Sequence, residues 1–175
     1  TFIWTSTNAA SVFESTPSNL LSTKTNVFDT YVNPTTKVYN VLLNQQTTVD
    51  AITGIKSEET YTYDGTVNSD SYYGLQTQKI AKKFSDTTLQ ATTTVTTEYE
   101  NNPYIGRPKK VNTSTTYMGD TRTKEELYTY AGANLTSTVK TGHNTSYGMV
   151  EYMTYDVAGN ILTKTISAPG APVAI

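Results

Sequence analysis

The chain has 175 residues, enough for one domain, but only 36% of them are hydrophobic and 14 are Tyr, which leaves less core-forming material than a typical globular domain has. The net charge of −2 provides no electrostatic basis for binding nucleic acid or an anionic membrane, and the absence of Cys excludes disulfides and thiolate metal sites. About a fifth of the residues are Thr. Because Thr and Tyr favour a pleated, half-exposed surface, the composition predicts an all-β protein with little or no helix.

The predicted elements begin with an irregular or strand-like segment over residues 1–26, with a break near Pro17. A helical turn is the alternative to a strand only over residues 74–86. Residues 168–175, "APGAPVAI", are typical of a Pro/Gly/Ala linker-like tail. Period-two alternation of side chains, which is the signature of strands, is clearest over residues 91–99, 111–117 and 161–167.

A Tyr-centred motif recurs through residues 27–167. Its copies are "VFDTYVNPTTKV" (27–38), "YTYDG" (61–65), "TEYENNPYIGRP" (97–108), "YTYAGANLTSTVK" (128–140) and "YMTYDVAGNILTKT" (152–165). The aromatic anchors lie 35, 36, 31 and 25 residues apart, at Phe28, Tyr63, Tyr99, Tyr130 and Tyr155. Such periods indicate a repeat architecture, and their unequal lengths favour β-hairpins of varying length over a strict solenoid.

The clearest copy predicts its own turn. Asp156 suits the first position of a type I turn, because its carboxylate can accept a bond from the backbone N–H two residues on. Gly159 then takes the left-handed position of a bulged hairpin loop, and Asn160 can satisfy loose backbone groups. Gly65, Glu100 and Ala131 depart from this pattern, so their turns should differ in type. Second turns within the periods are predicted at Thr53-Gly54, Ser85-Asp86, Met118–Asp120 and Thr141–Asn144.

Two turns per period predict an antiparallel, meandering ribbon of β-hairpins in one open sheet. Where the pattern is Tyr-x-Tyr, both rings share a face and can form a cross-strand ladder. The residues that we expect to carry the repeat and its turns are Tyr63, Asp64, Tyr130, Gly132, Asn134, Tyr155, Asp156, Gly159 and Asn160.

At these residues the chain resembles the YD-repeat or RHS-repeat family. "YMTYDVAGNILTKTIS" has the family's Tyr-Asp, its Gly-Asn and the following apolar-Thr strand in order, and the resemblance extends over residues 27–167. It implies a long, spiralling, curved β-ribbon. In bacterial polymorphic toxins and toxin-complex B and C subunits such a ribbon forms a shell around a toxic polypeptide, and in teneurins a similar shell supports adhesion. The RHS core with its autoproteolytic aspartyl motif has no match in this chain.

The resemblance therefore implies a non-catalytic structural segment of a large secreted or cell-surface bacterial protein, a scaffold or shell that encloses or presents a toxin or adhesive domain. Its expected partners are further repeats of the same parent chain, and either an encapsulated toxin polypeptide or a surface glycan. Nucleic-acid binding, membrane insertion, metal sites and cofactors are not expected. As an isolated piece, the ribbon should be an open sheet with exposed edges.

Catalytic groups are scarce. The single His, His143, lies between turn residues in "TGHN", where a solvated side chain is expected. The pairs Glu58/Glu59 and Glu125/Glu126 are adjacent in strand-like sequence, so their members should point to opposite faces, which disfavours a shared acid/base site and a polysaccharide hydrolase. The alternative function is a carbohydrate-binding or adhesin-type β-module. Its candidate glycan-stacking residues are Tyr61, Tyr63, Tyr128 and Tyr130.

Overall fold

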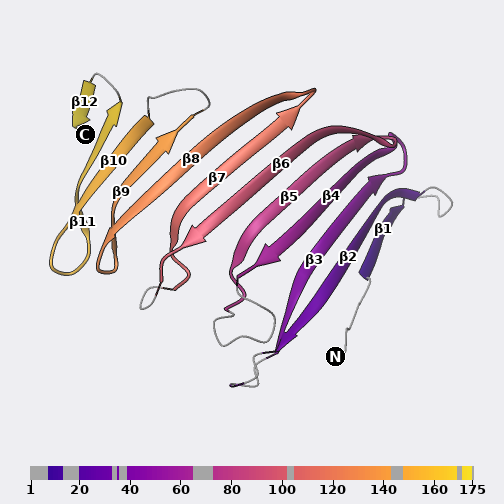
Figure 1. Cartoon of the computed structure of the whole chain (residues 1–175), viewed down its shortest axis with the longest axis horizontal. Helices are drawn as coiled ribbons and strands as arrows, with labels where there is room; N and C mark the ends of the chain where they lie inside the picture. Colours follow the sequence, from indigo (N-terminus) through magenta and orange to yellow (C-terminus); the bar gives the residue numbers. More distant parts are fainter. Residues whose placement is uncertain are drawn as a thin grey trace. The chain divides into compact units, whose positions relative to one another are not determined.

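The chain is an all-β protein whose antiparallel strands form one open sheet (Figure 1). The computed structural model describes residues 8–13, 20–32, 35, 39–64, 73–101, 105–142, 148–168 and 171–174. Each strand neighbours the next one in sequence, so the sheet is a meander, and no helix occurs in these ranges. The predicted fold class is therefore confirmed.

The strands are long for a β protein. Their bounds are β1 (Asn8–Phe13), β2 (Leu20–Val32), β3 (Tyr39–Asp50), β4 (Ile55–Tyr63), β5 (Gln76–Ser85), β6 (Thr88–Tyr99), β7 (Pro108–Tyr117), β8 (Asp120–Ala131), β9 (Asn134–Thr141), β10 (Gly148–Tyr155), β11 (Ile161–Ala168) and β12 (Ala171–Ala174). All three segments with predicted alternation are strands: residues 91–99 lie in β6, 111–117 in β7 and 161–167 in β11.

Strands occur at two of the predicted boundaries. The boundary predicted between residues 26 and 27 falls inside β2, whose pairing register with β3 shifts between Val27 and Phe28. Within the expected linker-like tail, Ala171–Ala174 forms β12 and pairs with β11 from Ala168↔Ala171 to Thr165↔Ala174. A Pro is compatible with such a strand because β12 pairs on only one side in the described part of the chain.

The helical turn considered for residues 74–86 does not form. Gln76–Ser85 is strand β5, which pairs with β4 from Tyr63↔Gln76 to Ile55↔Ser85. The β4 edge supplies backbone hydrogen bonds along the whole segment, and the Lys79 ammonium lies 2.8 Å from the Glu59 carboxylate across the pair. A short isolated helix has no comparable tertiary support, so strand pairing prevails over local helix propensity.

Side chains are only partly covered. No large side chain is fully buried among the residues that the structure describes, and Thr138, 4% exposed, is the buried polar residue. Most other strand positions are half-exposed. The low hydrophobic fraction of the sequence is thus matched by a sheet that forms no deep core in its described part.

Contacts divide the chain into two compact units. The first holds Thr1–Thr94 with Thr116–Asp120, and the second holds Val95–Thr115 with Thr121–Ile175. The paired strands of the first unit run from β1 to β5, and those of the second from β8 to β12. The residue 27–167 repeat region is therefore shared between two units, each of which holds copies of the motif.

Tight hairpin turns occur at three of the predicted places, Thr53-Gly54, Ser85-Asp86 and Met118–Asp120. The β3–β4 turn is closed by a bond from the Gly54 N–H to the Asp50 carbonyl at 3.0 Å. The Asp50 carboxylate accepts bonds from the N–H groups of Ile52 and Thr53, which lower its pKa. Two-residue turns follow Ser85 and Tyr117. Of the predicted turn at 141–144, residues 143 and 144 lie outside the described residues, so His143 does too.

Candidate functional site: tyrosine-anchored loop necks

Three motif tyrosines fasten their strand to the preceding one. Each is the last or the last but one residue of its strand, and its hydroxyl donates a hydrogen bond to a backbone carbonyl of the strand before it. The bonds run from Tyr63 to Leu43 (2.8 Å), from Tyr130 to Pro108 (3.0 Å) and from Tyr155 to Leu135 (2.5 Å). A phenol reaches further than a backbone N–H, so it can satisfy a carbonyl beyond the end of the regular ladder. On the β3–β4 pair, for example, regular pairing ends at Gln45↔Thr60.

A β-bulge faces each of these tyrosines on its other side. Register shifts between Thr62 and Tyr63, between Thr129 and Tyr130, and between Thr154 and Tyr155, so the following strand carries one extra residue. In two copies that residue is a Thr that bonds back. The hydroxyls of Thr77 and Thr136 donate to the carbonyls of Thr62 (3.2 Å) and Thr129 (3.0 Å). A bulge raises the local twist and redirects the chain, and in these three copies it lies at the same point of the motif.

The loops beyond Tyr63, Tyr99 and Tyr155 are each closed at the base by the residue that follows the tyrosine. We call this base the loop neck. The N–H of Asp64 donates to the Leu75 carbonyl, that of Glu100 to Arg107, and that of Asp156 to Asn160, at 2.8, 2.9 and 3.0 Å. The same kind of backbone hydrogen bond thus closes three loops of different length.

The neck at Asp156 is the predicted turn. The Gly159 N–H donates to the Asp156 carbonyl at 3.1 Å, and the φ of Gly159 is 86°. The Asp156 carboxylate accepts bonds from the N–H groups of Ala158 (2.9 Å) and Asn160 (2.8 Å). The Asn160 amide bonds that same carboxylate at 2.9 Å and not a backbone group, which differs from the expectation. The bonds from Asn160 are the main cause of the lowered pKa of Asp156.

At Asp64 the carboxylate has a related role in a longer loop. Its two oxygens accept bonds from the N–H groups of Tyr73 (3.0 Å) and Leu75 (2.7 Å). Gly65 lies outside the described residues, so the turn type expected there stays a prediction. Asp64 and Asp156 therefore close their loops, and their carboxylate oxygens accept hydrogen bonds from the backbone of the loop.

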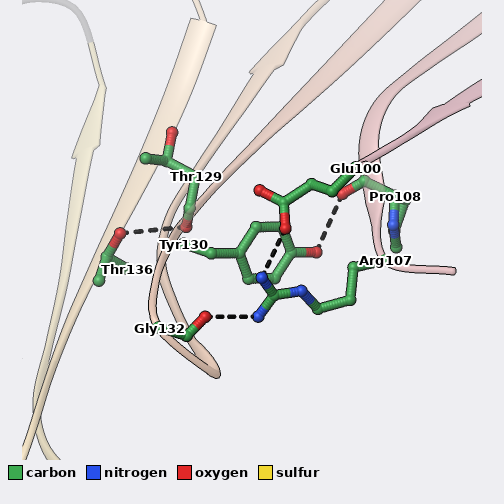
Figure 2. A network of polar contacts seen from close by, with 7 residues as sticks. All are labelled: Glu100, Arg107, Pro108, Thr129, Tyr130, Gly132 and Thr136. Atoms are coloured by element: carbon green, nitrogen blue, oxygen red, sulfur yellow. Dashed lines mark hydrogen bonds and ion pairs between the residues drawn. The ribbon is translucent and has the colours of Figure 1, made fainter. Parts of the chain in front are cut away.

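Where Glu replaces the Asp, an arginine completes the neck (Figure 2). The Arg107 guanidinium lies 2.5 Å from the Glu100 carboxylate, donates at 2.6 Å to the Gly132 carbonyl and stacks 4.3 Å from the centre of the Tyr130 ring. Arg107 therefore ties one loop neck to the hairpin turn of the next copy. Burial is the main cause of the raised pKa of Tyr130.

Where Ala replaces the Asp, the loop is too short to need a carboxylate. Ala131 pairs directly with Asn134, and Gly132, with a φ of 57°, and Ala133 form a two-residue turn. The side-chain oxygen of Asn134 lies close to Gly159, so the turns of two successive copies adjoin. The expectation that this turn differs from the one at Asp156 is confirmed.

A second recurring group was not singled out from the sequence. On β4, the Tyr61 hydroxyl donates to the Glu59 carboxylate at 2.5 Å, and on β8 Tyr128 donates to Glu126 at the same distance. Burial first, and then the bonded carboxylate, raise the pKa of each tyrosine to about 12. The signal was present as "EETYTY" and "EELYTY", because residues two apart in a strand share a face.

The four predicted glycan-stacking rings are engaged within the sheet. All are half-exposed, and all four hydroxyls donate to a carboxylate or a carbonyl. The Lys79 ammonium lies 5.6 Å from the Tyr61 ring, and Arg107 covers Tyr130. Two of the four rings therefore have a face partly occupied by a cation.

The carboxylate pairs are likewise neutralised by the chain. Glu59 and Glu126 form ion pairs with Lys79 and Lys124, while their neighbours Glu58 and Glu125 pair with Lys56 (2.5 Å) and Lys110 (2.8 Å). The Lys79 and Lys124 ammonium groups are the main cause of the lowered pKa values of Glu59 and Glu126. Within the described ranges no group of three or more metal-ligating side chains converges, and no helix is long and apolar enough to span a membrane.

No model of a known protein family matches the chain, and no curated protein matches its sequence.

Proposed function

We propose that the chain is a non-catalytic structural segment of a large secreted or cell-surface protein of the YD/RHS type, in which it forms part of a β-ribbon scaffold that encloses or presents another domain. The observation that carries the proposal is the repeated bond from a motif tyrosine to the preceding strand. It recurs in both compact units with the same bulge on its other side.

This arrangement suits a scaffold because it makes each hairpin depend on its neighbour. Tyrosine hydroxyls, bulge threonines and neck carboxylates satisfy backbone groups at the points where the regular ladder stops. A ribbon poor in Leu and Val thus gains order from specific hydrogen bonds between successive copies, and such an array can be extended by adding copies.

The carbohydrate-binding alternative is less favoured by the same contacts. A sugar-stacking platform presents an exposed ring face, whereas Tyr61 and Tyr130 have cations near their rings and all four candidate hydroxyls are engaged. Binding there would require breaking bonds that organise the sheet.

The test is the sequence of the parent gene on both sides of these 175 residues. We expect further copies with an aromatic anchor, a neck residue and a Gly-containing turn, at periods of about 25–36 residues, followed by a domain of a different composition. Flanking modules unrelated to the repeat would overturn the proposal. A glycan-array screen of the purified chain distinguishes the scaffold from the carbohydrate-binding module. Saturable glycan binding that is lost in Tyr61→Ala and Tyr128→Ala, while both variants remain folded, would favour the carbohydrate-binding module.

A further inference from the structure

The last copy of the motif has a sulfur where the copies on β4 and β8 have a phenol. "EETYTY" on β4 and "EELYTY" on β8 align with "VEYMTY" on β10, so Met153 takes the position of Tyr61 and Tyr128. In those two copies the hydroxyl of this residue bonds the carboxylate two residues earlier. On β10 the sulfur of Met153 instead lies beside the hydroxyl of the anchor tyrosine, Tyr155.

The Tyr155 hydroxyl therefore faces two acceptors. It donates at 2.5 Å to the Leu135 carbonyl of β9, and it lies 3.8 Å from the Met153 sulfur. A phenol has a single proton to donate and a thioether is a weak acceptor, so the carbonyl receives the stronger bond. Regular pairing of β9 with β10 ends at Tyr152↔Ser137, so the bond to Leu135 holds the two strands together beyond that end.

Oxidation of the sulfur reverses the order of the two acceptors. A hydroperoxide transfers one oxygen atom to a thioether, so the sulfur is oxidised by two electrons to a sulfoxide, the peroxide is reduced to water or an alcohol, and no bond of the protein breaks. The sulfoxide oxygen carries a partial negative charge and accepts hydrogen bonds strongly. Bound to a sulfur 3.8 Å from the Tyr155 hydroxyl, it can reach that proton. Met153 is half-exposed, so a small peroxide has access to it.

We propose that Met153 is an oxidation-sensitive modification site that controls the Tyr155 anchor. Its sulfoxide takes the Tyr155 proton from the Leu135 carbonyl, and the ends of β9 and β10 loosen where regular pairing has stopped. Reduction of the sulfoxide restores the anchor. All three residues belong to the second compact unit, and the proposal does not rest on the scaffold role.

Two variants of the full chain, each with a single Met, test the site. The chain has three Met residues, and both variants carry Met118→Asn. One adds Met149→Leu and keeps Met153. The matched control adds Met153→Leu and keeps Met149, which is 39% exposed and lies on the same face of the same strand. Each variant is treated with dilute hydrogen peroxide, the sulfoxide is quantified by mass spectrometry, and Tm is measured before oxidation, after it, and after treatment with methionine sulfoxide reductases.

We expect oxidation of Met153 to lower Tm by about 2–4 °C and oxidation of Met149 to lower it by less than about 1 °C. The reductases should restore the original Tm. Adding Tyr155→Phe to the variant that keeps Met153 separates proton capture from the polarity of the sulfoxide. Without the hydroxyl, oxidation should lower Tm by less than half as much. Circular dichroism before oxidation establishes that each variant is folded.

An NMR measurement observes the Leu135 carbonyl itself. Leu is followed by Thr at only two places in the chain, Leu135-Thr136 and Leu162-Thr163. Labelling Leu carbonyls with ¹³C and Thr amides with ¹⁵N therefore gives one carbonyl signal for each. Oxidation of Met153 should shift the Leu135 signal more than the Leu162 signal, in the direction that Tyr155→Phe shifts it without oxidation.

Four outcomes would overturn the proposal. Met153 could stay reduced under conditions that oxidise Met149. Its sulfoxide could leave the Leu135 signal in place. Oxidation could lower Tm equally with and without the Tyr155 hydroxyl, as expected for a polarity effect alone. Finally, oxidation of Met149 could lower Tm as much as oxidation of Met153.

Discussion

The hydroxyl of Tyr155 offers a direct measurement of what the repeated tyrosine contributes. Tyr155→Phe removes one hydroxyl and leaves the Leu135 carbonyl, which accepts its bond at 2.5 Å, without that donor. A net hydrogen bond contributes about 0.5–1.5 kcal/mol, and leaving a buried acceptor unsatisfied costs about 1–3 kcal/mol. Because Tyr155 is half-exposed, water can partly replace the phenol, so we expect a loss of about 1 kcal/mol.

The matched control is Tyr152→Phe on the same strand, since Tyr152 is 54% exposed. Removing its hydroxyl should change the stability by less than about 0.5 kcal/mol. Urea unfolding at low protein concentration measures both variants, and for a chain of this size the Tyr155→Phe loss should lower Tm by roughly 2–4 °C. Equal effects of the two substitutions, or a neutral Tyr155→Phe, would refute the fastening role of the motif tyrosine.

Three further changes test other parts of the structure. The pKa of Tyr61 is raised to about 12, so the folded state holds this proton more tightly than the unfolded state, and its contribution to stability should be complete below about pH 10 and be lost between pH ~10 and ~12. In urea unfolding measured against pH, Tyr61→Phe should reduce this loss, and an equal fall of the unfolding free energy in both proteins would contradict the prediction. Met118 has a φ of 48°, which a Met side chain rarely adopts, so Met118→Asn should raise stability by roughly 0.5–1 kcal/mol, and a lower Tm would argue against backbone strain there. A Cβ on Gly148 would lie 2.9 Å from the Lys140 carbonyl oxygen, so Gly148→Ala should cost about 1–3 kcal/mol in chemical denaturation, whereas a neutral effect would show that β9 and β10 separate easily.

The sequence predicted the architecture well because period and turn chemistry are local properties. The alternation in 161–167 and the Asp and Gly of the turn at 156–159 act within a few residues, so each could be read without tertiary knowledge. The meander also followed, since short turns allow only antiparallel neighbours.

The contacts between copies could not be read in this way. Arg107 reaches Gly132 over a separation of 25 residues, and the tyrosine hydroxyls reach carbonyls 20–22 residues back, distances set by strand pairing and not by local pattern. The helical alternative for residues 74–86 failed for the same reason, because the β4 edge decides the conformation of β5. The Glu-x-Tyr pattern is present in two similar hexapeptides, but the hydrogen bond of 2.5 Å from the tyrosine hydroxyl to the carboxylate is seen only in the structure.

The loop neck has a consequence for how such a chain can change. The same kind of backbone hydrogen bond closes the loops between Asp64 and Leu75, between Glu100 and Arg107 and between Asp156 and Asn160. The pairing of the strands therefore does not depend on the length of these loops. Insertions at these three places should cost only the entropy of the added loop, which grows slowly with length. Each of these three necks is therefore a place where a new segment can be inserted while the strands that hold it keep their pairing.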